Sequence, residues 1–232
     1  MELTGKKALV TGGAVRIGKA ISNALRAEGA EVIVHFRSSE KAANAFRPNV
    51  IQADLNDPAQ CNTLIEKVSE QFGPIDVLVN NAAVFDQCSL AESTREAVMK
   101  ELQPNLFAPL ALIRKFAEQK RSGKIINLLD RRITSHDTAY IPYMLSKKSL
   151  EELTKLAAIE LAPNITVNAV APGAVLPPPD KEGDPAWEPA GTIPLGKRPT
   201  PEEIAAAVIY LLKTDIITGQ TLFIDGGQHL VD

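Results

Sequence analysis

Short apolar runs alternate with longer amphipathic segments along most of the chain. The runs predict buried β-strands at residues 7–11, 31–36, 50–53, 75–79, 124–129, 165–170 and 221–224. The segments between them predict helices at 16–28, from about 40 to 46, and at 58–72, 93–119, 142–161 and 201–212. This alternation is typical of α/β proteins. It predicts a single Rossmann domain over residues 1–232, in which a doubly wound parallel sheet of about seven strands carries helices on both faces.

Two segments depart from this pattern. Pro104 and Pro109 lie inside the predicted helix 93–119, and we expect the helix to break or bend there because proline lacks a backbone donor. Residues 173–199 are rich in proline and follow neither the helical nor the strand period. We interpret them as a Pro-rich substrate loop that closes over an active site, with a surface insert of no function as the alternative.

Composition narrows the class of ligand. The net charge of -3 gives no sign of nucleic acid or anionic membrane, so we expect a small-molecule substrate and neither of those partners. No apolar run is long enough to span a bilayer, and the first strand begins too early for a signal peptide, which predicts a soluble cytoplasmic protein. Cys61 and Cys88 lack the spacing of metal ligands, so we expect packed thiols and no metal.

A glycine-rich turn follows the first predicted strand. Gly12, Gly13 and Gly18 lie between that strand and a helix, where such a turn brings backbone N–H groups to a pyrophosphate. A plain glycine-rich turn is the alternative. Arg37 and Ser38 follow the second strand, where enzymes that use NAD usually carry an acidic residue. A guanidinium there favours a 2′-phosphate, so we expect NADPH/NADP as the cofactor.

The residues with the clearest chemistry follow the fifth predicted strand. Tyr143 and Lys147 are four residues apart on a helix and share one face, so the ammonium is expected to lower the pKa of the phenol toward neutrality. Tyr143 can then deliver the proton that a hydride acceptor needs. Asp130 is the third member of this group, at the end of the strand.

In this order and spacing, the motifs resemble those of the short-chain dehydrogenase/reductase family along the whole chain. The matching residues are Thr11-Gly12-x-x-x-x-x-Gly18, Asn80-Asn81-Ala82, Asn105, Tyr143-x-x-x-Lys147 and Pro172-Gly173. The resemblance implies an NADP-dependent oxidoreductase that forms a homotetramer. It also implies that Asp130, Tyr143, Lys147 and Asn105 are catalytic, with Lys147 on the nicotinamide ribose and Asn105 anchoring a water. We expect the cofactor to contact Gly12, Arg16, Ile17, Gly18, Arg37, Ser38, Asp54, Leu55, Asn81, Ala82, Lys147, Pro172 and Gly173.

Two departures from the family pattern point to one branch of it. Arg16 replaces the middle glycine of the turn, and Asp130 replaces the catalytic serine. Both changes resemble pteridine reductases and dihydromonapterin reductases, and Phe85 matches the aromatic residue that stacks on the pterin in those enzymes. We therefore expect the substrate to be bound by Arg16, Phe85, Tyr143, Leu176 and Trp187. Phosphate binding alone for Arg16, and simple packing for Phe85 and Trp187, are the alternatives.

Asp130 discriminates between substrates. An ionised carboxylate would repel the oxyanion that develops in carbonyl reduction, whereas a carboxylic acid bonded to Tyr143 can relay a proton to the nitrogen of a C=N bond. We predict a reductase that transfers hydride from NADPH to the C=N bond of a pteridine-like substrate, dihydropterin to tetrahydropterin. A carbonyl or 3-oxoacyl reductase and a non-catalytic NADPH-binding protein are the alternatives. Arg131 and Arg132 are expected to be solvated.

Overall fold

The computed structural model describes residues 1–177 and 191–231. These residues form one sheet of seven parallel strands in the order β3-β2-β1-β4-β5-β6-β7. The strands are β1 (Lys7–Val10), β2 (Glu31–Phe36), β3 (Val50–Gln52), β4 (Val77–Asn80), β5 (Gly123–Leu128), β6 (Ile165–Pro172) and β7 (Thr221–Ile224). The strand order reverses between β1 and β4, so a ligand crevice is expected beyond the carboxyl ends of these two strands.

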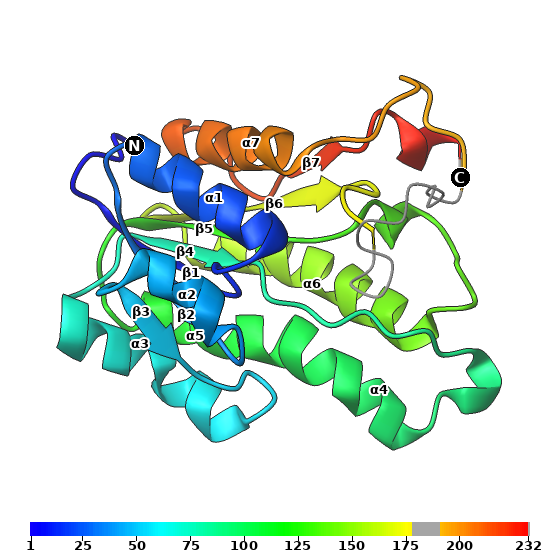
Figure 1. Ribbon diagram of the computed structural model, residues 1–232, viewed down its shortest axis with the longest axis horizontal. Coiled ribbons are helices and arrows are strands. Elements are labelled where there is room, and N and C mark those ends of the chain that lie inside the picture. Colours follow the sequence, from blue (N-terminus) through cyan, green and yellow to red (C-terminus); the bar gives the residue numbers. More distant parts are fainter. Residues whose placement is uncertain (178–190, 232) are drawn as a thin grey trace.

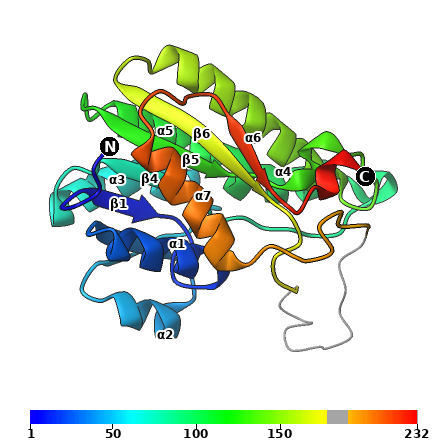
Figure 2. The ribbon, with the colours of Figure 1, turned by 90° about the horizontal axis from the view of Figure 1, so that it is seen from above.

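Helices cover both faces of the sheet (Figures 1 and 2). The bounds are α1 (Arg16–Ala27), α2 (Glu40–Ala43), α3 (Pro58–Phe72), α5 (Ala108–Ala117), α6 (Ile141–Glu160) and α7 (Pro201–Lys213). Helices α1, α2 and α7 bury one face together with Ala8 and Val10 of β1, and α3, α5 and α6 bury the other face with Leu9. Alternate residues of each strand therefore enter different cores, which explains why these strands are apolar throughout.

The predicted helix 93–119 is one continuous helix that is interrupted by a π-helical turn. Helix α4 (Arg95–Leu102) passes into a π-helical turn, η3 (Gln103–Phe107), and then into α5. Pro104 is the second residue of the π-helical turn and Pro109 the second residue of α5, so each proline lies at a change of segment. The wider turn absorbs the proline and brings Asn105 into the buried interior, with 0% of its surface exposed.

The remaining helical pieces are short 3₁₀ turns that connect the main elements. They are η1 (Asn44–Phe46), η2 (Leu90–Glu92), η4 (Arg131–Thr134) and η6 (Gln228–Leu230). Within residues 1–177 and 191–231, no helix is both long and apolar enough to cross a membrane. The same residues hold no group of three or more His, Cys, Asp or Glu side chains arranged for a metal ion. The single Rossmann-like sheet confirms the predicted fold class.

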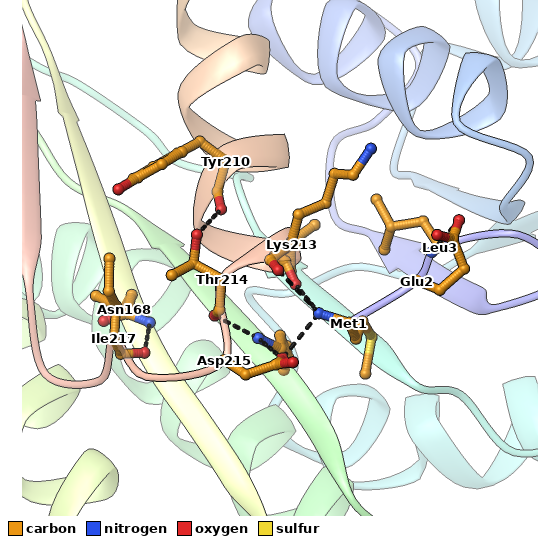
Figure 3. A network of polar contacts seen from close by, with 11 residues as sticks. Met1, Glu2, Leu3, Asn168, Tyr210, Lys213, Thr214, Asp215 and Ile217 are labelled. Carbon is orange, nitrogen blue, oxygen red and sulfur yellow. Dashed lines mark hydrogen bonds and ion pairs between the residues drawn. The ribbon is translucent and has the colours of Figure 1, made fainter.

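A polar network joins the carboxyl end of α7 to β5 and to the start of the chain (Figure 3). Asp215 Oδ1 lies 2.8 Å from Lys124 Nζ and 2.8 Å from the amino group of Met1. Lys124 is buried and also donates to the carbonyl oxygen of Thr214 at 2.6 Å. The Met1 amino group donates to the carbonyl of Leu212 at 3.0 Å, one of the carbonyls that the end of the helix leaves unpaired.

We expect Asp215→Asn to lower the melting temperature at pH 7, because the buried Lys124 ammonium then loses its carboxylate partner. The hydrogen bond from Lys124 lowers the pKa of Asp215 to about 2, so the stabilisation is present above the ordinary carboxyl pKa and is lost as the pH falls toward 2. The difference between the two proteins in thermal unfolding should therefore narrow below pH 4. Glu70→Gln, an exposed acidic residue on α3, is the control, and an equal loss of stability in that variant would contradict the role of Asp215.

Candidate active site

Two glycine positions and a set of hydrogen bonds determine the shape of the turn between β1 and α1. Gly12 has a φ of +61°, which favours glycine, and a Cβ added to Gly18 would overlap the carbonyl oxygen of Gly12. Asn81, after β4, donates its side-chain amide to the carbonyl of Thr11 at 2.8 Å. The Thr11 hydroxyl accepts the backbone N–H groups of Asn81 at 2.9 Å and Ala82 at 3.0 Å. The two strand ends at the switch point are thus bonded directly to each other.

His35 is a structural member of this turn. Its Nδ1 accepts the backbone N–H of Gly12 at 3.1 Å, and its Nε2 lies 3.0 Å from the carbonyl oxygen of Ala53. This pattern requires the neutral imidazole with its proton on Nε2. Burial lowers the pKa of His35 to about 4, so the ring stays neutral at physiological pH.

A cavity of about 350 Å³ opens in front of the turn. It is lined by Gly12, Ala14, Val15, Arg16, Ile17, Gly18, His35, Phe36, Arg37, Ser38, Ser39, Asp54, Leu55, Asn56, Asn81, Ala82, Ala83, Val84 and Pro104. The structure therefore brings together most of the predicted cofactor residues. Backbone N–H groups at a helix N-terminus suit a pyrophosphate, and the exposed Arg37 and Ser38 at the end of β2 suit a further phosphate.

Arg16 provides a second sign of an anion site. It is a non-glycine residue with a φ of +53°, and its Nη2 donates to the carbonyl oxygen of Pro177 at 2.6 Å. Its Nη1 is buried and has no hydrogen-bond partner among the described residues. A buried guanidinium N–H without an acceptor is costly, and a bound phosphate or a substrate oxygen would satisfy it.

The reactive groups lie beyond β5, at the start of α6. Tyr143 Oη donates a hydrogen bond of 2.9 Å to Asp130 Oδ2. Asp130 Oδ1 accepts the backbone N–H of Arg132 at 2.8 Å, and the Arg132 guanidinium lies 3.8 Å from Oδ2. Both carboxyl oxygens of Asp130 therefore accept hydrogen bonds, and Oδ2 also faces a cation. This set of donors suits a carboxylate that accepts the hydroxyl proton of Tyr143.

The expected lowering of the Tyr143 pKa by Lys147 is wrong. The pKa of Tyr143 is raised well above its usual value, chiefly by burial and then by the charge and hydrogen bond of Asp130. Lys147 instead donates to the carbonyl oxygen of Leu128 at 2.7 Å, with Nζ 5.9 Å from the centre of the phenol ring. Burial lowers the pKa of Lys147 to about 8.

Asn105 does not contact Lys147 through any hydrogen bond of its side chain. Its Oδ1 accepts the backbone N–H of Val84 at 2.9 Å, and its Nδ2 lies within 3.1 Å of the Val84 carbonyl, the Glu101 carboxylate and the Ser146 hydroxyl. In the described residues, the Asn105 amide thus holds the backbone of the loop after β4. The water that the resemblance implies stays a prediction.

An aromatic cluster stands next to the reactive groups. The rings of Phe85 and Tyr140 stack at 4.4 Å with an angle of 9°, and Phe85 meets Tyr143 edge-on at 4.6 Å and 75°. The Arg132 guanidinium lies 5.1 Å from the Phe85 ring centre and 3.5 Å from the Asp137 carboxylate. Phe85 keeps 41% of its surface exposed, so a flat ligand can reach it.

The expectation that Arg131 and Arg132 are solvated is wrong. Arg131 is 6% exposed, and the side chain of Arg132 is 22% exposed. The sequence analysis missed Arg132, Tyr140 and Glu101 as residues of the site. Arg132 and Tyr140 carried a weak signal, since Arg132 follows Asp130 by two residues and Tyr140 precedes Tyr143 by three.

The other predicted site residues lie further away or outside the described residues. Leu176 is partly buried against the core on the α1 side of the sheet. Pro172 ends β6 and Gly173 follows it, donating its N–H to the carbonyl oxygen of Ile224 at 3.0 Å; neither residue lines the cavity beside the glycine turn. Trp187 lies outside the described residues, so its contact with substrate stays a prediction, as does the closing of the loop 173–199.

A cavity lined by the glycine turn at the switch point of a parallel sheet, together with a buried Tyr-Lys pair after β5, is typical of a dinucleotide-dependent oxidoreductase. The family model described as enoyl-(acyl carrier protein) reductase matches residues 13–229. The chain belongs to the short-chain dehydrogenase/reductase family.

The relatives within this family carry several activities in their names. Pteridine reductase 1 of Leishmania tarentolae is 32% identical over 98% of this chain and 97% of its own length. The 3-oxoacyl-[acyl-carrier-protein] reductase FabG of Thermotoga maritima is 35% identical over 98% of this chain and 99% of its own. The crystal structure of FolM alternative dihydrofolate reductase 1 from Brucella suis in complex with NADP has 32% identity and a TM-score of 0.92, covering 100% of this chain and 98% of that one.

We expect kcat/KM for reduction to fall as the pH rises through about 8. The Lys147 ammonium is protonated below its pKa of about 8, whereas the Tyr143 phenol stays protonated far above that pH. The measurement is a pH profile of steady-state reduction. Lys147→Arg should abolish the alkaline fall because a guanidinium does not titrate in this range. Lys148→Arg, on the next residue of α6, is the control and should keep it. A fall near pH 8 that survives in Lys147→Arg would show that another group sets it.

Proposed function

We propose that the protein is an NADPH-dependent reductase that adds hydride to the C=N bond of a dihydropterin or a closely similar heterocycle. The observation that carries this proposal is the hydrogen bond from Tyr143 to the Asp130 carboxylate. In most of the family, the position of Asp130 holds a neutral serine. An ionised carboxylate in that place suits a substrate that is positively charged when it is most reactive, and a protonated imine has that property.

The residues of the cavity support NADPH as the cofactor. The glycine turn and the unpaired Arg16 Nη1 would hold the pyrophosphate, Asp54 and Leu55 would border the adenine, and Arg37 with Ser38 would hold the 2′-phosphate. Arg37 is exposed and has no ion-pair partner in the described part of the chain, so its guanidinium is available. Bound NADPH supplies the hydride for the reaction.

Side chains of the protein itself then supply the proton and stabilise the charge of the substrate. Tyr143 Oη gives its proton to the substrate nitrogen, which forms the protonated imine, and the phenolate left on Tyr143 regains a proton from solvent; Asp130 orients the phenol through the 2.9 Å hydrogen bond. A protonated imine attracts the Asp130 carboxylate, whereas a ketone gains negative charge during reduction and is repelled by it. The expected relay through a neutral Asp130 carboxylic acid is therefore replaced in this proposal by electrostatic stabilisation from the carboxylate.

The shape of the site also supports a flat heterocycle. Phe85 offers a partly exposed aromatic ring within 4.6 Å of the Tyr143 ring. Relatives named pteridine reductase and alternative dihydrofolate reductase are consistent with a substrate of this class. We further propose a homotetramer, which the exposed apolar side chains of Leu145, Leu156 and Ile159 on α6 support.

The second candidate is a carbonyl or 3-oxoacyl reductase. It is favoured by the relative named 3-oxoacyl reductase, whose identity with this chain is 35%. The contact of Asp130 with Tyr143 argues against it, because a carboxylate bonded to the proposed proton donor would repel the oxyanion that a ketone develops.

NADPH oxidation with dihydrobiopterin, dihydromonapterin and a 3-oxoacyl thioester separates the two candidates. We expect turnover of a dihydropterin, and we expect Asp130→Asn to lower its kcat/KM by about 100-fold, because the amide keeps the shape but loses the charge. Asp130→Ser should reduce dihydropterin more slowly and the thioester faster. Tyr143→Phe should lose ~10²- to 10⁴-fold in kcat through removal of the proton donor.

The proposal fails if neither dihydropterin supports turnover above the rate without substrate. A dihydropterin rate that Asp130→Asn leaves unchanged would remove the carboxylate from the mechanism. A Tyr143→Phe variant with full cellular function would instead favour a non-catalytic NADPH-binding protein.

Arg37 should determine the choice between the two nicotinamide cofactors. We expect Arg37→Gln to raise the dissociation constant of NADPH about 10- to 100-fold and to leave that of NADH within about twofold, because only NADPH carries the phosphate. Fluorescence titration of each cofactor measures both constants. Arg47→Gln, an exposed arginine before β3, is the control, and an equal weakening of NADH binding by Arg37→Gln would contradict phosphate recognition.

A further inference from the structure

Glu101 is a buried carboxylate to which the proposed function gives no role. It lies on α4, one helical turn before Asn105, and only 2% of its surface is exposed. Glutamate is rarely buried to this extent, because removing the charge from water is costly unless donors surround it. Burial raises the pKa of Glu101, and its hydrogen bonds oppose that change. The partners of the carboxylate therefore show what its burial achieves.

Both oxygens of Glu101 accept hydrogen bonds. Oε1 accepts the backbone N–H of Asp86 at 2.8 Å, and Oε2 accepts from Asn105 Nδ2 at 2.9 Å. Both partners are donors, and this arrangement suits the ionised carboxylate, which offers acceptors alone. A glutamine would offer one oxygen and one NH₂ group, and in the same place that NH₂ would face a donor.

Asn105 bonds to the same loop on the other side of Phe85. Its Oδ1 accepts the N–H of Val84 at 2.9 Å, and its Nδ2 lies 3.0 Å from the carbonyl oxygen of Val84. The backbone before and after Phe85 is thus held by two side chains one turn apart, Asn105 and Glu101. We call the three residues 84–86 the Phe85 segment.

The Phe85 ring is held by residues of the active site and lies outside the three buried apolar clusters of the core. It is 41% exposed. Its neighbours are the Tyr140 ring, the Tyr143 edge and the Arg132 guanidinium, all of which belong to the active site. A ring on a loop that is fixed before the substrate arrives binds a flat ligand with a smaller entropy loss than a mobile one.

We propose that Glu101 is a positioning residue for substrate binding: through the Asp86 N–H and the Asn105 amide, its carboxylate holds the Phe85 segment so that the Phe85 ring is ready to receive a planar heterocycle. This inference rests on the proposed function, since it takes Phe85 as the ring on which the substrate stacks. It assigns to Glu101 no contact with the substrate and no proton transfer.

The test compares Glu101→Gln with Glu96→Gln, an exposed glutamate on the same helix, in the NADPH-bound enzyme. We expect Glu101→Gln to raise KM for dihydropterin about tenfold, with kcat changed by less than about threefold, since one charge-assisted hydrogen bond is lost. Hydrogen exchange at the Asp86 amide should be ~10-fold faster in Glu101→Gln and unchanged in Glu96→Gln. Glu101→Asp, which keeps the charge on a shorter side chain, should give a smaller KM effect and covers the case in which the glutamine variant does not fold.

A double variant tests whether Glu101 acts through Phe85. Phe85→Ala should raise KM by itself, and adding Glu101→Gln to it should raise KM no further. Provided that the wild-type enzyme reduces dihydropterin, three results would each overturn the role of Glu101 alone: effects of the two changes that multiply, an unchanged KM in Glu101→Gln, or unchanged hydrogen exchange at Asp86 in that variant. If the wild-type enzyme reduces no dihydropterin, the proposed function fails and this inference fails with it. A failure of the inference alone is seen only when the wild-type enzyme is active, so the two failures are distinguishable.

Discussion

The hydrogen bond between Tyr143 and Asp130 is the interaction on which the chemistry of this site depends. It joins the end of β5 to the first turn of α6, so the register of strand and helix must be correct for it to form. Because the phenol is buried and faces a carboxylate, its proton is held more tightly than in water. The same surroundings bury Lys147, and the lowering of its pKa from 10.5 to about 8 corresponds to ~3 kcal/mol of disfavoured charge. The fold tolerates this cost at the place where chemistry needs a titratable group.

The rest of the architecture brings two separate regions to one sheet edge. The glycine turn and the loop after β4 are bonded through Thr11 and Asn81, which closes the cofactor side of the crevice. On the substrate side, the loop after β4 and the loop after β5 are joined by the bridge between Cys88 and Tyr140 and by the stacked rings of Phe85 and Tyr140. The loop after β4 therefore contacts both the glycine turn and the loop after β5.

The sequence was informative where one physical signal dominates. Apolar runs and capping residues predicted β7 and α3 with the bounds that the structure has, and Asp57 accepts the N–H of Ala59 as a helix cap. Tyr143 and Lys147 lie on one face of a helix, as their four-residue spacing predicted.

The π-helical turn at Asn105 was not predictable, since proline signals a break in α-helical hydrogen bonding but does not indicate which backbone geometry replaces it. Arg132 and Glu101 were missed because a charged residue is usually solvated, and only tertiary contacts reveal partners from other loops. The predicted direction of the Tyr143 pKa shift was wrong for the same reason. Burial raises this pKa and outweighs the charge of Lys147, which was all that the spacing suggested.

The charges of the assembled site favour one class of substrate over another. Asp130 and Glu101 bring two carboxylates into a region that also holds the cations Lys147, Arg131 and Arg132, and Arg132 is shared between Asp130 and Asp137. The shared Arg132 guanidinium lies 3.8 Å from Asp130 Oδ2, which is long for an ion pair. In a region largely shielded from water, the negative charge of Asp130 repels a developing oxyanion and attracts a protonated nitrogen. A site built for a ketone would need a neutral donor at this position, whereas a site for a protonated C=N bond gains from the charge that the structure retains there.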